Sequence, residues 1–493
     1  MKKYVLGIDQ STQGTKALLF NQNGELVERA DMSHVQIINE KGWVEHDLKE
    51  IYRNTIASVK KVIEKAGIDP SWIQTVGISN QRETGAVWDR KTGEPLWNAI
   101  VWQCSRAEEI CRRMKQQNPG LEKRIKEKTG LHFSPYFTAA KFTWLMEHVP
   151  GLCEKAARGE VCFGTIDSWL VYCLTRGRRF QTDVSNASRT QLFNIYQLKW
   201  DQELCDCFGI PMSCLPEVTD SNGDYGMTDL DGLLPEEVSI GAVLGDSHGA
   251  LYGQKCHEKG MIKATYGTGS SVMMNIGEHP VEGESVVTSL AWSIDGKAEY
   301  VLEGNINYTG AVITWLKDDL QLIQDPAETE ELALAANPLD QTYLVPAFTG
   351  LGAPYWNSEA RACICGMSRI TGKKEVVKAA LESIGYQIAD LVFEMEKVAG
   401  VQVRVLEVDG GPTANGYLMQ FQSDVLQIPV QTAAVAELSG AGAAYLAGIS
   451  CGIYEKQEIF SEKNRMIYRP LQEESVLEKR YLGWKRAVSQ VNI

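Results

Sequence analysis

Three short segments combine glycine with hydroxyl or amide side chains, which are residue types suited to holding phosphate. The first follows Asp9 and ends at Lys16, the second runs from Gly267 to Ser271, and the third is 410–415. Glycine lets backbone N–H groups approach phosphate oxygens because no Cβ atom intervenes. A single Gly/Thr segment is usually only a turn. Three of them at expected strand ends favour contacts to the phosphates and adenosine of a nucleotide.

The two most specific nucleotide motifs do not occur in the sequence. It contains neither Gly-x4-Gly-Lys-Ser/Thr nor Gly-x-Gly-x-x-Gly after a strand. A P-loop and a Rossmann dinucleotide site are therefore not predicted. The predicted nucleotide site is instead assembled from distant segments.

Short apolar runs precede these segments and predict the strands that position them. Residues 4–9 and 17–20 predict a β-hairpin around the first segment, and 261–266 and 405–409 lead into the other two. A further run, 239–245, ends directly before Asp246.

Helical periodicity over residues 47–66, followed by a buried strand at 75–79, indicates that helices alternate with strands. We therefore predict two α/β halves that meet near residue 250, with the ligand site between them, where concave sites commonly form.

The composition excludes several classes of protein. The chain has 493 residues with 49 Lys+Arg against 63 Asp+Glu, a net charge of −14. We predict no nucleic-acid partner and no membrane partner, although a local basic pocket for a phosphorylated ligand is compatible with this charge. None of the twelve cysteines forms a Cys-x-x-Cys pair. The close pairs Cys205/Cys207 and Cys363/Cys365 leave a metal or redox site open, but buried thiols in a reducing cytoplasm are favoured.

The motifs resemble those of the FGGY carbohydrate kinases. Segments 5–12, 267–269 and 409–411 are similar to the family's phosphate and adenosine motifs, and 136–145 to its signature segment. Within the family the similarity is strongest to the glycerol kinases. It is carried by 42–47, 80–84, 98–104, 186–190, 192–194, 345–356 and 419–424.

The resemblance implies an α/β fold of two duplicated ribonuclease H-like domains, as in actin and Hsp70, with a central cleft. Residues 1–249 would form the N-terminal domain with the substrate site and phosphate loop, and 250–493 the nucleotide-binding C-terminal domain. The implied activity is ATP-dependent phosphorylation of a hydroxyl of a small polyol or sugar. A homodimer or homotetramer is compatible with it.

The resemblance also assigns roles to residues. Asp246 would be the general base for the attacking hydroxyl, and Asp9 would hold Mg²⁺. The substrate would contact Arg82, Glu83, Trp102, Tyr136, Asp246 and Ser247. The nucleotide would contact Thr12, Gln13, Gly14, Lys16, Thr268, Gly310, Thr314, Gly411 and Asn415. An Arg-Glu dipeptide alone would indicate a surface ion pair. Because the whole segment 80–84 matches the glycerol kinases, we favour a role for Arg82 and Glu83 in the substrate site.

Two departures from the glycerol kinases lie beside the expected substrate. Ser247 follows Asp246 where those enzymes usually carry Gln, and Ser270 and Ser271 occupy positions where an apolar or aromatic residue usually follows. Small hydroxyl side chains leave room for a longer acceptor. We therefore predict glycerol first, with erythritol or xylulose as the alternative and a non-catalytic sensor of sugar or nucleotide as a second one. His248 could contact the substrate or cap the helix that starts after Asp246, and the cap is favoured.

Overall fold

The strand β1 (Tyr4–Gln10) is at the centre of the first sheet and is buried along its whole length. The computed structural model describes residues 2–433, 435, 437–460 and 465–492. β1 forms the predicted hairpin with β2 (Gly14–Asn21), in a register that pairs Asp9 with Lys16. It runs parallel to β6 (Ile73–Asn80), which runs parallel to β15 (Val238–Gly245).

Parallel strands place their carboxyl ends at one edge of a sheet, where ligands bind in open α/β folds. Asp9, the segment after Asn80, and Asp246 therefore meet at the same edge. The sheet order is β14-β15-β6-β1-β2-β3, with β14 (Met227–Thr228) and β3 (Leu26–Ser33) at its edges.

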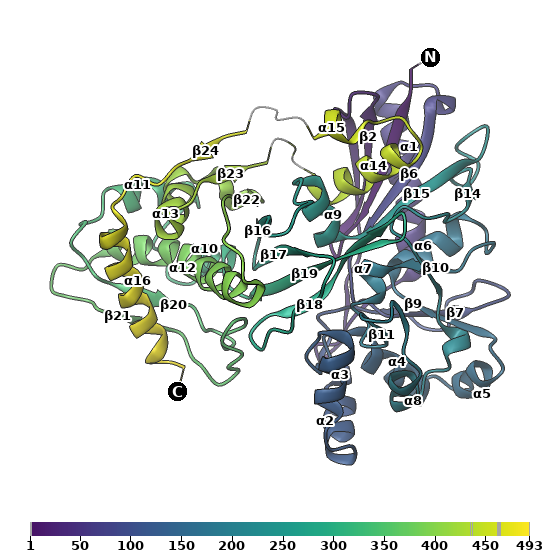
Figure 1. Ribbon diagram of the computed structural model, residues 1–493, viewed down its shortest axis with the longest axis horizontal. Coiled ribbons are helices and arrows are strands. Elements are labelled where there is room, and N and C mark those ends of the chain that lie inside the picture. The colour runs from purple at the N-terminus through teal and green to yellow at the C-terminus, as the bar shows by residue number, and fades with distance from the viewer. Residues whose placement is uncertain (1, 434, 436, 461–464, 493) are drawn as a thin grey trace.

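The second sheet faces the first across the centre of the molecule (Figure 1). Its order is β18-β19-β17-β16-β22-β23-β24. The strands are β16 (Ile262–Tyr266), β17 (Ser270–Gly277), β18 (Val287–Ile294), β19 (Lys297–Ile306), β22 (Leu406–Asp409), β23 (Val430–Thr432) and β24 (Ile467–Tyr468). The parallel pair β16 and β22 brings Thr265 opposite Asp409.

The helices α9 (Asp246–Gly253) and α14 (Leu438–Ser450) pack against each other, and α14 also covers β1, β6 and β15. Small residues permit this close approach: a Cβ atom added at Gly7 would lie 2.9 Å from the Gly440 carbonyl oxygen. A helix from the end of the chain thus completes the layer on the first sheet (Figure 1).

Helices cover the remaining faces. The predicted helix is α1 (Leu48–Ala66), whose N-cap Asp47 accepts a hydrogen bond from the Lys49 N–H. The others are α2 (Glu108–Gln117), α3 (Leu121–Thr129), α4 (Thr138–His148), α5 (Leu152–Ala157), α6 (Ile166–Leu174), α7 (Val184–Ala187), α8 (Gln202–Phe208), α10 (Gly310–Asp318), α11 (Glu328–Leu334), α12 (Lys373–Ala399), α13 (Gly416–Leu426), α15 (Lys456–Ile459) and α16 (Glu474–Ser489).

Short strands complete the fold outside the two large sheets. They are β4 (Ile37–Ile38), β5 (Val44–His46), β7 (Ala86–Asp89), β8 (Ala99–Ile100), β9 (Val161–Gly164), β10 (Gln181–Asp183), β11 (Phe193–Asn194), β12 (Lys199–Trp200), β13 (Glu217–Thr219), β20 (Tyr343–Val345) and β21 (Cys363–Cys365).

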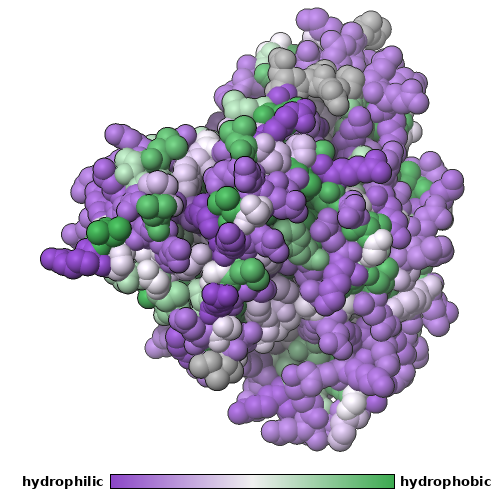
Figure 2. All heavy atoms as spheres, turned by 60° about the vertical axis from the view of Figure 1, so that its left-hand side comes forward, coloured by the Kyte–Doolittle hydropathy of each residue, from purple (hydrophilic) through white to green (hydrophobic). Residues whose placement is uncertain are grey.

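The surface and the thiols agree with the composition. On the face shown in Figure 2, hydrophilic side chains predominate and apolar ones are scattered. All twelve cysteines are free thiols. Among the residues described, no helix is both long and apolar enough to cross a bilayer, and no cluster of three or more His, Cys, Asp or Glu could hold a metal ion.

Candidate active site

A cleft of about 860 Å³ lies between the two sheets, at the carboxyl ends of β1 and β15. Side chains from both halves of the chain line it, as the prediction of a central cleft requires. They include Asp9, Ser11, Lys16, Asp246 and Ser247 from the first half and Lys263, Thr265, Asp409, Gly410, Gly411, Thr413 and Glu437 from the second.

Asp9 is a buried carboxylate in this cleft. The Ser79 hydroxyl donates a hydrogen bond of 3.0 Å to Asp9 Oδ1. Burial raises the pKa of Asp9 to about 6, with Lys16 and the Ser79 hydrogen bond opposing the shift and Asp246 and Glu437 adding to it. A carboxylate that ionises only with difficulty gains from a cation beside it, and this fits the predicted role in holding Mg²⁺.

Asp246 begins α9 and points into the cleft with 35% of its side chain exposed. Arg82 Nε lies 3.2 Å from Asp246 Oδ1, and the Ser247 N–H donates to the same oxygen at 2.6 Å. The carboxylate is therefore oriented and still accessible, as a general base must be.

A buried network of two arginines and two glutamates stands beside Asp246. Arg82 donates to both oxygens of Glu303, at 3.0 and 2.8 Å. Arg189 Nε donates to Glu83 Oε1 at 2.5 Å, and its Nη1 lies 2.8 Å from Glu303 Oε2. The two arginines hold the pKa of Glu303 well below its usual range against the effect of burial. The four charges compensate one another, which allows them to be buried.

Glu83 adopts φ +59°, in the left-handed region. A non-glycine residue in this region carries local strain, which is characteristic of functional sites. The Glu83 carbonyl accepts a hydrogen bond of 3.2 Å from the Thr138 hydroxyl, which holds the segment in place.

Tyr136 and Trp102 form the aromatic side of this region, with ring centroids 5.5 Å apart in an edge-on arrangement. Trp102 Nε1 donates to the Thr12 hydroxyl at 2.9 Å, which connects the aromatic wall to the first glycine and hydroxyl segment. Lys141 is buried, and its ammonium donates to the carbonyls of Pro135, Tyr136 and Phe137. Lys141 thus fixes the loop that presents Tyr136.

A second cavity, of about 420 Å³, continues from the cleft into the second half of the chain. Its wall is largely apolar, with Ile313, Leu381, Ile384 and Leu418. Four of the predicted nucleotide residues line it, namely Gly310, Thr314, Gly411 and Asn415. Gly411 lines both this cavity and the cleft, so a base in the cavity and phosphates in the cleft would be continuous.

The other predicted nucleotide residues are placed differently. Lys16 lines the cleft and forms an ion pair of 2.6 Å with Glu437. Thr12, Gln13, Gly14 and Thr268 line neither of the two cavities. The Asn415 side chain is already engaged, because it caps α13 at the Leu418 N–H and donates to the Thr329 hydroxyl.

His248 does not cap α9, contrary to expectation. The residue at the N-cap is Gly245, and the His248 ring is fully buried with neither nitrogen hydrogen-bonded to any described residue. Burial and the neighbouring Arg82 lower the pKa of His248 far below its usual value, so the ring is neutral.

Several site residues were not predicted. Glu303 and Lys263 are charged residues inside apolar strands. A charge in such a strand is the sequence feature that could have indicated a site residue. Arg189 and Lys141 lie in segments that resemble the family, 186–190 and 136–145, but the resemblance did not assign them a function. Lys263 is buried and donates to the Thr265 hydroxyl at 2.8 Å.

Comparison with known proteins decides the family. Residues 4–253 match the N-terminal domain, and residues 262–451 the C-terminal domain, of the FGGY family of carbohydrate kinases. The chain belongs to this family. The resemblance read from the motifs and the actin- and Hsp70-like α/β fold in two domains are thereby confirmed.

Individual relatives agree with this carbohydrate kinase assignment. Glycerol kinase 1 of Thermotoga maritima is 47% identical over 99% of both chains, and glycerol kinase of Caldanaerobacter subterraneus is also 47% identical over 99% of both. Glycerol kinase of Plasmodium falciparum, solved with ADP, superposes with a TM-score of 0.93 at 34% identity, over 100% of this chain and 98% of the other. This carbohydrate kinase is therefore a phosphotransferase with an alcohol group as acceptor and a small polyol or sugar as substrate.

Proposed function

We propose that the enzyme transfers the γ-phosphoryl group of ATP to a hydroxyl of glycerol and so forms glycerol 3-phosphate. The observation that carries the proposal is Asp246, held 3.2 Å from Arg82 Nε at the junction of the buried charge network and the cleft. The glycerol kinases that are 47% identical over 99% of the chain support glycerol as the acceptor.

The residues divide the work of the transfer between them. Arg82 and Glu83 supply a donor and an acceptor for the substrate hydroxyls, and the Trp102 and Tyr136 rings pack against its C–H groups. Asp246 removes the proton as the hydroxyl oxygen bonds to phosphorus. In-line phosphoryl transfer relies mainly on positioning and charge neutralisation, which the fixed orientation of Arg82 and Asp246 provides.

The nucleotide would bind with adenosine in the 420 Å³ cavity and phosphates in the cleft. Four carboxylates line the cleft, from Asp9, Asp246, Asp409 and Glu437, against two lysines. A polyphosphate therefore needs added positive charge there. Asp9 would hold Mg²⁺, which neutralises phosphate charge when bound.

Residues 1–249 and 250–493 would form the substrate side and the nucleotide side of the cleft. A cytoplasmic location and assembly as a homodimer or homotetramer stay predictions.

The test is ADP production by the purified enzyme with ATP, Mg²⁺ and a panel of acceptors: glycerol, erythritol, xylulose, ribulose and glycerone. We expect glycerol-dependent ADP, with glycerol 3-phosphate as the product. If none of these acceptors supports ADP production, the kinase assignment is rejected and the sensor is favoured. The variant Asp246→Asn, tested in parallel, controls for contaminating kinases.

A further inference from the structure

Lys263 is a buried lysine in the wall of the cleft, on the central strand β16 of the second sheet. Its side chain is 1% exposed, and its ammonium donates a hydrogen bond of 2.8 Å to the Thr265 hydroxyl. No other hydrogen bond and no ion pair joins the ammonium to any residue that the structure describes. Since an ammonium has three donors, two remain for a ligand.

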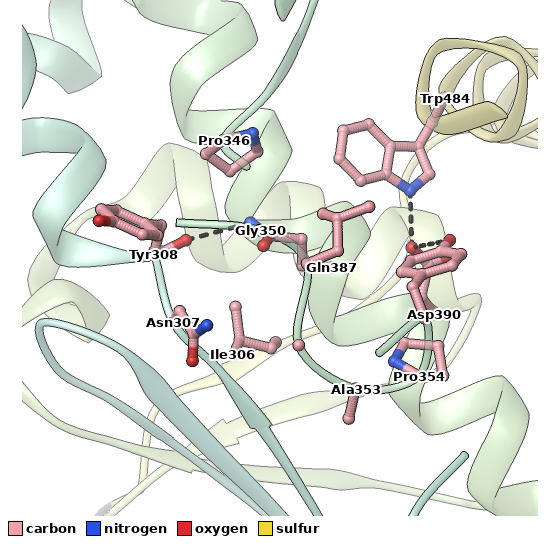
Figure 3. A pocket seen from close by; sticks show the side chains of 13 residues that line it. Ile306, Asn307, Tyr308, Pro346, Gly350, Ala353, Pro354, Gln387, Asp390 and Trp484 are labelled. Atoms are coloured by element: carbon pink, nitrogen blue, oxygen red, sulfur yellow. Dashed lines mark hydrogen bonds between the residues drawn. The ribbon is translucent and has the colours of Figure 1, made fainter. Parts of the chain in front are cut away.

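Other buried charges of the protein have several partners each. The Lys141 ammonium donates to three carbonyl oxygens. Asp390, on α12, accepts hydrogen bonds from the Tyr355 hydroxyl and from Trp484 Nε1, each at 2.8 Å (Figure 3). A buried charge without such partners lowers the stability of the fold. Lys263 is a buried charge of this costly kind, and it stands where a ligand can reach it.

Two carboxylates on the neighbouring strand β22 are held by other groups. Glu407, which is opposite Lys263 in the register of β16 and β22, binds Arg465 at 2.6 Å. Asp409, two residues further along β22, accepts a hydrogen bond of 3.1 Å from the Thr265 hydroxyl. Neither carboxylate forms an ion pair with Lys263.

The cleft has one other lysine, Lys16, which is already paired. Lys16 Nζ lies 2.6 Å from Glu437 Oε2. The cleft wall contains four carboxylates and these two lysines. Among the described residues of the wall, Lys263 is therefore the cation that remains for an anionic ligand.

Strand geometry directs the Lys263 side chain toward the edge of the sheet where the glycine segments lie. Lys263 and Thr265 are two residues apart on β16, so their side chains share one face of the sheet. Because the ammonium reaches the hydroxyl of a residue nearer the carboxyl end, the side chain extends toward that end of the strand. The segment 267–271 follows there directly.

Charges from both sides of the cleft act on Lys263. Burial lowers the pKa of Lys263, and Asp409, which precedes the third glycine segment, is the strongest charge opposing this shift. Arg82 lowers the same pKa further, while Glu303 and Asp246 raise it. The ammonium thus lies between the segment expected to hold the nucleotide and the carboxylate expected to act as the base. A phosphoryl group that moves from one side to the other has to pass this position.

We propose that Lys263 is a catalytic residue, which binds the γ-phosphoryl group of ATP during its transfer to the acceptor. The acceptor oxygen bonds to the γ-phosphorus as the bond from this phosphorus to the bridging oxygen of ADP breaks, and the hydroxyl proton passes to Asp246. Lys263 keeps its proton, forms no covalent bond and donates hydrogen bonds to the equatorial oxygens of the group in transfer. The inference rests on the proposed function and adds a residue to it.

The first test compares binding of ADP with binding of the β,γ-imido analogue of ATP, each with Mg²⁺, in the full-length enzyme. By isothermal titration calorimetry, Lys263→Met should weaken the analogue by about 10- to 150-fold, the loss of one hydrogen bond to a charged group. ADP lacks the γ-phosphate, so its affinity should change less than about twofold. The exposed Lys259 lines neither cavity, so Lys259→Met is the matched control and should change neither affinity.

Steady-state kinetics with glycerol gives a second measurement. Lys263→Met should lower kcat at least as far as it weakens the analogue, with little change in the KM for glycerol. Lys263→Gln can still donate to the Thr265 hydroxyl but has no charge, and it should lose kcat in the same way. Both variants remove a buried charge without an ion-pair partner, so we expect them to fold, and urea unfolding checks this.

Three results would overturn the role of Lys263: equal weakening of ADP and the analogue, an analogue affinity that neither variant lowers, or a near-normal kcat in Lys263→Gln. The last result would mean that the lysine only holds Thr265. The proposed function fails separately, if the wild type forms no ADP with any acceptor of the panel. Because the binding experiment contains no acceptor, its result holds whichever acceptor the enzyme uses.

Discussion

Replacing Asp9 by Asn should make the enzyme more stable and inactive at the same time. Asp9 is 5% exposed, and its carboxylate is ionised at neutral pH in a site that raises its pKa to about 6. Asn has the same shape and can still accept the hydrogen bond from Ser79, so the substitution removes mainly the buried charge. Charged groups that an active site requires commonly lower the stability of the fold.

The sign and size of the change in unfolding free energy follow from the pKa of Asp9. A raised carboxyl pKa means that the folded state binds the proton more tightly than the unfolded state, so the stabilisation by that proton is lost as the pH rises through about 6. The shift from 3.8 to about 6 corresponds to about 3 kcal/mol at about 1.4 kcal/mol per pH unit. Asp9→Asn should thus exceed the wild type by up to about 3 kcal/mol at pH 8 and by about half of that at pH 5.

Urea unfolding followed by tryptophan fluorescence, without nucleotide or Mg²⁺, measures this difference at both pH values. Asp318→Asn changes an exposed carboxylate and should shift stability little and equally at pH 5 and pH 8. Equal stability of Asp9→Asn and wild type at pH 8, or a difference independent of pH, would refute the argument that burial of this charge destabilises the fold.

Three further predictions concern the remaining parts of the site. Asp246→Asn should lower kcat by about 10²- to 10⁴-fold with little change in acceptor KM, because it removes the base; a near-normal kcat in steady-state assays would exclude this role. Arg82→Met should cost about 3–5 kcal/mol in urea unfolding, since it leaves Glu303 buried with only one arginine, and should raise the acceptor KM; unchanged stability would contradict the network. Gly310→Ala should raise the KM for ATP several-fold while the acceptor KM stays constant, because the added Cβ would lie 2.6 Å from the Gly267 carbonyl oxygen; an unchanged KM for ATP would place that loop outside the nucleotide site.

The sequence predicted the parts of the fold that local patterns control. The runs that became β1, β15, β16 and β22 are short, apolar and end at an acidic residue or glycine, which marks both the strand and its limit. The helix α1 shows its apolar periodicity and its Asp47 cap in the same stretch. Of the six substrate residues inferred from the resemblance, Arg82 lies 3.2 Å from Asp246, and Trp102 contacts Tyr136. Their roles toward the substrate stay predictions.

The pairing of charges in the buried network could not be predicted from local sequence patterns. Glu303 lies 221 positions from Arg82, and a charge within the apolar run of β19 gives no indication of its partner. Pairing over such distances depends on how the sheets face each other. The error at His248 has a related cause, since a polar residue in a first helical turn suggests a cap until tertiary packing turns it inward.

The position of α14 has a consequence for the synthesis of this protein. The apolar strands β1, β6 and β15 are complete once residue 245 has been made, but the helix that covers them begins at Leu438. At about 5–20 residues per second, the ribosome needs about 10–40 s to add the intervening segment. During that interval the nascent first sheet lacks one of its layers. The N-terminal half therefore cannot finish folding as it emerges, and we expect it to depend on chaperone protection until the C-terminal half is released.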